Sequence, residues 1–322
     1  MGLDIGAAVV AEPPFNDSNA DIILLSSDGF LFYVHKLLLS LVSPLFSTMF
    51  TLPDLHSQEI YDARPCVEVS DDARHLLLLL SWCDPRCTMQ SSMQSTKQNL
   101  LDLQMVLETA DKYGMESIVK RVEGVLILSQ EIIRQAPLKV FAIAVRYRCE
   151  GLARVAARET LKCPQLVKSD GQREPELKHL SAFAFINLQE YHLRCVEAAV
   201  KVASHYNWVS RGTPPASFFS SSCTPRQADC PIVTNSHGVW LVWWIDYMAL
   251  ASQILRERPT GSSVSQASLL SKIHTKIGSG SCSTCHHDGH NRLAEFALLF
   301  EAKIDEEISK VMIFSPFLPS GV

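Results

Sequence analysis

The sequence has no long apolar run and no concentrated positive charge, and each absence removes a class of function. The longest apolar run is Val239–Ile245, far shorter than the roughly 20 residues that cross a bilayer. No run of Lys or Arg exceeds two residues, and the formal net charge is −5. Broad nucleic-acid binding needs a concentrated basic face. We therefore expect neither a membrane nor a nucleic-acid partner.

Recognisable catalytic motifs are also missing. Gly278, Gly280 and Gly289 form neither a G-x-G-x-x-G fingerprint nor a Walker sequence. The chain has no G-x-S-x-G nucleophile elbow and no H-E-x-x-H helix. These absences predict a protein that is not an enzyme.

The N-terminal segment is unlike a secretory signal. It reads MGLDIGAAVVAEPPF, with Asp4 and Glu12 around a short apolar stretch and no basic leader. We expect an intracellular protein, cytoplasmic or nuclear, whose ten cysteines are mostly reduced.

The residues that are present indicate strands near the N-terminus and helices afterwards. Asp21–Leu25 and Phe30–Val34 read as strands joined by the turn signal Ser27-Asp-Gly29, and Cys66–Val69 alternates as a third strand. A helix is expected to stop before Pro44, another to begin after Asp71 or Asp72, and another to break at Gly114.

Beyond residue 130 the spacing predicts only helices, with Pro137 at the start of one. Strands followed by helices predict an α+β fold, with a short sheet plus helices at the N-terminus and an all-α C-terminal region. The expected segments are a flexible tail at 1–18, a domain at 19–128, a helical region at 129–208 and a helical C-terminal region at 209–322.

The spaced pattern of the first strands and helices is specific. It runs Asp21-Ile-Ile-Leu-x(4)-Gly29-x(3)-Tyr33-Val34-His35-Lys36-x(2)-Leu39-x(3)-Ser43-Pro44-x-Phe46-x(2)-Met49-Phe50, and the later Ala110-Asp-Lys-Tyr-Gly-Met115 fits an A-x-K-Y helix. Residues 19–128 thus resemble a BTB/POZ domain. The remaining chain is similar in style to the helical C-terminal regions of fungal BTB proteins.

The resemblance implies a module for protein–protein contact, acting as a scaffold or adaptor. In the family, the aspartate that opens the first strand and the basic residue after the histidine form a buried charged pair near the dimer face. Those residues are Asp21 and Lys36 here, so the resemblance implies a homodimer with both in its interface. The open alternative is that both are exposed ends of a strand and a helix. His35 is expected to fill a structural hydrogen-bonding position.

Family members often link a cullin scaffold to a ubiquitination target. Such adaptors tend to carry a hydrophobic-x-Glu triplet after the Met-Phe helix. The corresponding triplet here is Ser57-Gln58-Glu59, with Leu55 nearby. Because the apolar residue is missing, we expect cullin binding to be weak or absent.

A Cys/His cluster near the C-terminus indicates a structural zinc ion. Residues 282–290 read Cys-Ser-Thr-Cys-His-His-Asp-Gly-His, and a C-x2-C pair presents two thiolates to one metal. Zinc needs four ligands, so an upstream pair must complete the site. The expected ligands are Cys223, Cys230, Cys282 and Cys285, with His237, His286, His287 and His290 as substitutes. Ordinary loop cysteines remain the alternative.

Two rival functions stay open beside the scaffold or adaptor. One is a transcription-associated regulator that recruits partners through the BTB-like domain, although no DNA-binding element is evident. The other is a metal-dependent enzyme in the C-terminal half. A catalytic metal site needs an acid-base residue nearby, and Asp288 is the only acidic residue within the cluster. The enzyme is therefore the weaker rival.

Overall fold

The structure, a computed structural model, divides the chain into two compact units, Met1–Val155 and Ala156–Val322. Each unit is described by itself. The residues that the structure describes are 8–51, 60–87, 96–164, 175–205, 207–210, 232–235, 238–279 and 283–313. Within these ranges, no helix combines the length and the apolar content that a membrane crossing requires.

A small mixed sheet opens the first unit. Its strands are β1 (Val9–Val10), β2 (Ile22–Leu25), β3 (Phe30–Val34), β4 (Ile60–Tyr61) and β5 (Arg64–Glu68). They lie in the order β1-β3-β2-β5-β4. β2 pairs antiparallel with β3 and parallel with β5. The three predicted strands are confirmed, and β1 and β4 are two short additions.

The predicted turn between β2 and β3 is confirmed, and its side chains fix it to the start of α3 (Ala73–Cys83). Gly29 has a φ of +87°, a conformation that glycine adopts without steric cost. The buried Ser26 hydroxyl accepts from the backbone N–H of Phe30 at 2.8 Å. The Asp28 carboxylate accepts from the Ser26 hydroxyl at 2.6 Å and from the Ala73 N–H at 2.8 Å.

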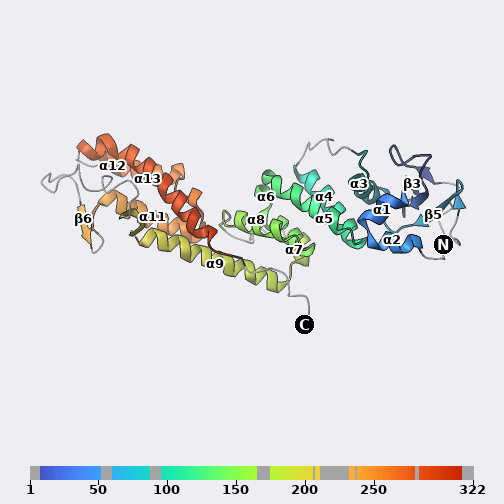
Figure 1. Ribbon diagram of the computed structural model, residues 1–322. Helices are drawn as coiled ribbons and strands as arrows, with labels where there is room; N and C mark the ends of the chain where they lie inside the picture. Colours follow the sequence, from blue (N-terminus) through green and yellow to red (C-terminus); the bar gives the residue numbers. More distant parts are fainter. Residues whose placement is uncertain are drawn as a thin grey trace. The chain divides into compact units, whose positions relative to one another are not determined.

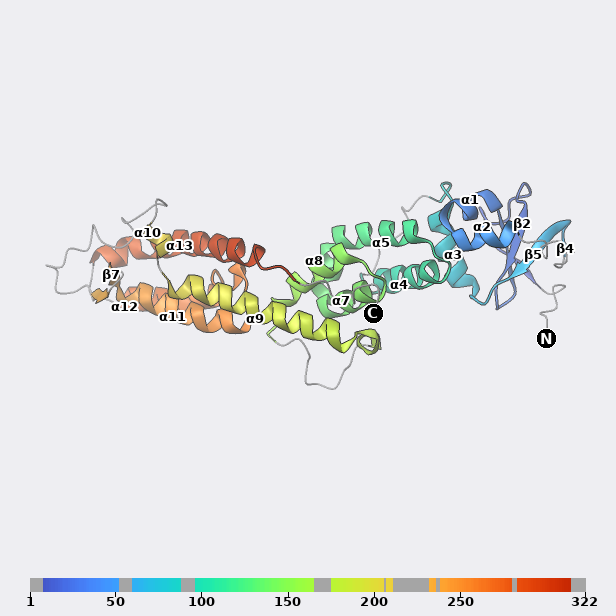
Figure 2. The same ribbon diagram turned by 60° about the horizontal axis from the view of Figure 1, so that its bottom comes forward.

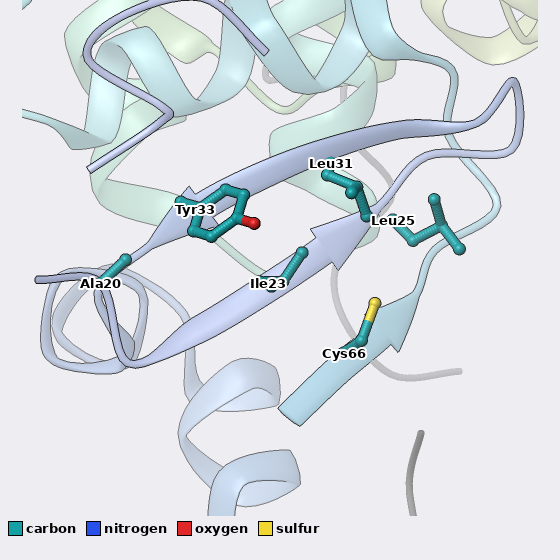
Figure 3. Packing of buried hydrophobic residues seen from close by; sticks show 6 residues of the cluster. All are labelled: Ala20, Ile23, Leu25, Leu31, Tyr33 and Cys66. Atoms are coloured by element: carbon teal, nitrogen blue, oxygen red, sulfur yellow. The ribbon is translucent and has the colours of Figure 1, made fainter. Parts of the chain in front are cut away.

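One face of the sheet carries a compact apolar cluster (Figure 3). Alternate residues of β2 and β3 point to this face, as the two-residue period of a strand requires. Cys66 joins them from β5. The cluster consists of Ala20, Ile23, Leu25, Leu31, Tyr33 and Cys66.

The flexible tail predicted for residues 1–18 differs from the structure from Ala8 onward. Val9 and Ala11 donate backbone hydrogen bonds of 2.9 Å to carbonyls at the edge of β3. Phe15 is only 2% exposed, and its ring centroid lies 6.0 Å from that of Phe32. Pairing with the edge strand and burial of one aromatic ring order a segment whose composition suggests a loop.

Helices make up the rest of the first unit. They are α1 (Lys36–Val42), α2 (Pro44–Thr51), α3 (Ala73–Cys83), α4 (Thr96–Lys112), α5 (Glu116–Leu128), α6 (Gln130–Gln135) and α7 (Pro137–Arg146). Figure 2 shows α4 and α5 side by side. The predicted signals are confirmed: Asp72 caps α3 through the His75 N–H at 2.9 Å, Gly114 separates α4 from α5, and Pro137 begins α7.

The C-terminal region is mostly helical. Its elements are α8 (Glu150–Thr160), α9 (Ala182–Ser204), α10 (Asn207–Ser210), α11 (Val242–Glu257), α12 (Ala267–Ser279) and α13 (Ser283–Ser309), with short 3-10 turns at Pro175–His179 and Gly261–Ser263. In the second unit, α9 packs on α11 and α13, and α12 packs on α11 and α13 (Figure 1). Trp244, Tyr247, Phe296 and Phe300 are fully or almost fully buried between them.

The C-terminal region is mostly helical, as predicted, and it also contains one short element that is not helical. A hairpin of β6 (Ile232–Asn235) and β7 (Gly238–Leu241) precedes α11. Its short apolar and β-branched segments favour strands, but they continue directly into the apolar start of α11. The boundary between β7 and α11 therefore lies inside one apolar run and cannot be recognised from the sequence. A second difference is that α13 begins at Ser283, so Cys285 and His286 lie on a helix and not in the predicted loop.

Candidate interaction surface

Leucines of α1 and α2 form an exposed apolar strip on the first unit. Leu37 and Leu41, one turn apart on α1, are 67% and 73% exposed. Leu45, at the start of α2, is 49% exposed. The opposite side of α1 holds Leu39, which is 1% exposed and packs in the core. The helix therefore has apolar residues on its solvent side as well as on its core side.

Asp21 and Lys36 meet at the N-terminus of α1. The Asp21 carboxylate accepts a 2.7 Å hydrogen bond from the backbone N–H of Lys36, one of the N–H groups that a helix leaves unsatisfied at its start. Asp21 is exposed, and the Lys36 ammonium lies 6.0 Å from the centre of the Phe50 ring. The two residues are thus adjacent, through a backbone contact that needs no second copy.

His35 takes part in a polar cluster that the sequence did not indicate. Its Nε2 lies 3.3 Å from Asp17, which also accepts from Arg86 at 2.6 Å. Arg86 pairs in addition with Asp84 at 2.7 Å. The backbone N–H of Asn19, followed by Arg86 and His35, lowers the pKa of Asp17 to about 2. The cluster ties the N-terminal segment to the end of α3, so His35 has a structural partner.

The A-x-K-Y segment, at the end of α4, contacts two other parts of the first unit. Lys112 donates to Asp71 at 2.6 Å, and the Tyr113 hydroxyl donates to the same carboxylate. The Tyr113 ring stacks on Phe46 with centroids 4.8 Å apart. Burial and the Asp71 carboxylate raise the pKa of the Tyr113 phenol, so it stays a hydrogen-bond donor. The segment therefore connects the end of α4 to α2 and to the residue Asp71, which lies just before α3.

Residues 13–130 match the family model of the BTB/POZ domain. The chain carries a BTB/POZ domain. The family match spans β2–β5, α1–α5, and the surface formed by Leu37, Leu41 and Leu45. A search of curated proteins finds no match to the chain. The BTB/POZ domain is a protein–protein interaction module, which agrees with an apolar surface open to solvent.

Most of the predicted zinc ligands lie outside the part of the chain that the structure describes. These are Cys223, Cys230, Cys282 and His237. Cys285 and His286 are placed only as positions in the first turn of α13. Among the described side chains, no group of three or more His, Cys, Asp or Glu is placed to hold a metal ion. The four-cysteine site therefore stays a prediction.

The remaining cysteines fit structural roles. Of the six cysteines outside the predicted zinc site, Cys66, Cys149 and Cys195 are buried. Burial raises the pKa of Cys149 to about 12 and that of Cys195 to about 11. These two thiols stay protonated at neutral pH, and a protonated thiol is a poor nucleophile and a poor metal ligand.

The second unit has a groove of about 670 Å³ between α9, α10 and α13. The Trp208 indole contributes to its wall and stacks on Phe300 with centroids 5.7 Å apart. Lys303 and Lys310 both contact Glu307, at 2.9 and 2.7 Å. With Arg194 and Lys201 against Glu197 added, four cationic and two anionic side chains line the groove, so the groove carries a net positive charge. Sequence reasoning did not indicate it, since its residues come from helices a hundred positions apart.

Proposed function

We propose that this chain is a scaffold or adaptor without catalysis, which self-associates through α1 and α2 of its BTB/POZ domain. The observation that carries the proposal is the exposure of Leu37 and Leu41 on the solvent side of α1. A surface helix of a soluble domain normally has a polar outer face. A run of exposed leucines on an interaction module is typical of a surface that a partner covers.

A second copy of the same domain is the occupant that we propose. A two-fold interface uses the same patch on both subunits, so each leucine position contributes buried apolar area once on each subunit. Complete burial of one leucine side chain contributes roughly 1.5–3 kcal/mol. Two leucines on each of two subunits therefore supply a substantial driving force before the entropy cost of association is subtracted.

We propose further that Asp21 and Lys36 lie at the border of this interface. They stand at the N-terminus of the helix that carries Leu37 and Leu41. A charge that becomes buried on association needs a partner of opposite sign. An Asp–Lys pair, repeated by the two-fold axis, supplies that partner on each side.

Sedimentation velocity over a wide concentration range tests the proposal on the full chain. The wild-type chain should convert from monomer to dimer as its concentration rises. The double variant Leu37→Lys, Leu41→Lys should remain monomeric. The two new lysines of one subunit would face the two of the other, and like charges repel. Leu128→Lys is the matched control, since Leu128 is 83% exposed at the end of α5. A wild-type monomer throughout, or a double variant that still dimerises, would overturn the proposal.

A structural zinc at Cys223, Cys230, Cys282 and Cys285 remains a separate proposal, supported by the C-x2-C spacing. Elemental analysis of the full chain should give about one zinc for this four-ligand site. The double variant Cys282→Ser, Cys285→Ser should release it. Purified wild-type protein that contains no zinc and gains no stability from added zinc would leave these residues as ordinary cysteines.

A further inference from the structure

The excess positive charge of the groove in the second unit lies on the wall that α9 provides. The lysine, arginine and glutamate side chains on this wall, among the described residues, are Arg194, Lys201 and Glu197. Lys201 is exposed. Arg194 and Lys201 are two helical turns apart, so they lie on one face of α9 and about 10 Å apart along its axis. A ligand with two carboxylates at this separation can reach both cations.

The opposite wall, on α13, holds its lysines in fixed ion pairs. Lys303 contacts Glu306 and Glu307, both at 2.9 Å. Lys310 contacts the same two carboxylates, both at 2.7 Å. The Glu307 and Glu306 carboxylates raise the pKa of Lys303, so its ammonium stays charged. Carboxylates placed between cations repel a continuous phosphate backbone, whereas a ligand with a few separate negative charges can avoid them.

The apolar part of the groove is a rigidly held indole. Trp208, on α10, donates from its Nε1 to the carbonyl oxygen of Val202 at 2.9 Å. Its ring stacks on Phe296 and Phe300, with centroids 5.8 and 5.7 Å away. The indole is partly exposed, and Val311 lies beside it in the lining of the groove. An aromatic ring fixed in this way offers an apolar ligand group a large contact area at little cost in conformational entropy.

We infer that the groove binds an extended acidic peptide segment of a partner protein, in which apolar residues stand between two carboxylates. Residues three positions apart in an extended peptide are separated by about 10 Å, which matches the separation of Arg194 and Lys201. An apolar side chain between the two carboxylates would then pack on Trp208. Cation clusters recognise acidic motifs in this way in other interaction modules.

This inference deepens the proposed scaffold or adaptor function and rests on it. An adaptor needs a second contact surface beside the one through which it self-associates. The groove belongs to the second unit, whereas the proposed self-association uses α1 and α2 of the first unit. The two contacts can therefore be tested separately on the same chain.

Calorimetric titration of the full chain with the synthetic peptide GSELFEGS tests the inference. Its two glutamates are three positions apart and enclose two apolar residues. The matched peptides are GSKLFKGS, which reverses both charges, and GSESSEGS, which removes the apolar residues. We expect GSELFEGS to bind, the other two to bind at least about tenfold more weakly, and added salt to weaken the complex.

Exchange of one charge gives the decisive comparison. Lys201→Glu should weaken binding of GSELFEGS at least about tenfold, because a charged hydrogen bond is replaced by repulsion. The same variant should gain affinity for GSKLFEGS or GSELFKGS, in which one glutamate is a lysine. Lys272→Glu is the matched control, since Lys272 is an exposed lysine of α12 outside the groove lining. Circular dichroism checks the fold, and Arg194→Gln replaces Lys201→Glu if that variant does not fold.

Three results would overturn the peptide site. They are no binding of GSELFEGS at millimolar concentration, equal affinities in Lys201→Glu and Lys272→Glu, and tighter binding of polyuridylate than of the peptide, which would make the groove a nucleic-acid site. Sedimentation of Lys201→Glu should show the same association as wild type. Failure of the peptide site with intact self-association is thus distinguished from failure of the scaffold proposal.

Discussion

The hydroxyl of Ser43 donates a 2.6 Å hydrogen bond to the carbonyl oxygen of Tyr113, seventy residues further along the chain. The Ser43 hydroxyl oxygen in turn accepts from the backbone N–H of Phe46 at 3.1 Å and so caps α2. Ser43 is fully buried. This one side chain therefore connects the helices of the exposed leucine strip to the end of α4.

Replacement of Ser43 by alanine should lower the free energy of unfolding of the BTB/POZ domain by about 1–3 kcal/mol, the cost of a lost cap and an unsatisfied buried carbonyl. Urea unfolding followed by circular dichroism measures the effect. Ser81→Ala is the control, because the Ser81 hydroxyl donates to the Leu77 carbonyl of its own helix and bridges no distant segment as Ser43 does; the change in stability should be less than about 0.5 kcal/mol. Equal urea midpoints for the two variants would show that the Ser43 contact does not contribute to stability.

Acid should destabilise the second unit through His192. Burial lowers the pKa of His192 from 6.5 to about 4, and its Nε2 lies 2.8 Å from the Thr160 hydroxyl. As pH falls below 6.5 the unfolded chain takes up the proton first, so the free energy of unfolding decreases until pH reaches about 4. The total loss is at most about 3.4 kcal/mol, from roughly 1.4 kcal/mol for each pKa unit.

Tryptophan fluorescence is a suitable measure, since four of the five tryptophans lie in the second unit. His192→Gln should flatten the dependence of stability on pH between 6.5 and 4. His205→Gln, on an exposed histidine of the same unit, should leave it unchanged. A wild-type profile that is already flat in this window would contradict the role of His192.

Cullin binding is expected to be weak, because Ser57 stands where adaptors tend to have an apolar residue. A few apolar anchors dominate most protein interfaces. Ser57→Leu restores the hydrophobic-x-Glu triplet and should strengthen binding to a purified cullin in a pull-down, whereas Ser57→Thr should not. Stoichiometric recovery with the wild-type chain would show that the triplet does not decide binding.

Local signals made much of the first unit predictable from the sequence. The turn at Gly29, the cap at Asp72 and the break at Gly114 depend on one or two neighbouring residues, and all three are confirmed. The pairing of Val9–Val10 with β3 was not predictable, because a strand of two residues has no measurable periodicity. The hairpin of β6 and β7 was missed because its apolar residues merge with those of α11.

The candidate site was predicted only in outline. The resemblance indicated Asp21 and Lys36. It did not indicate that Asp21 would accept from the backbone N–H of Lys36, because that contact requires α1 to begin at Lys36. Arg86 reaches Asp17 across 69 positions, and no local pattern reports such a distance.

Hydrogen exchange tests the central claim, self-association through α1 and α2, most directly. The full chain would be exchanged at concentrations above and below the midpoint of its association, and the protection of its peptides compared by mass spectrometry. We expect added protection in peptides covering Lys36–Val42 and Pro44–Thr51 at high concentration, with no change across α9–α13. Added protection confined to the second unit, or none anywhere despite a measured dimer, would contradict it.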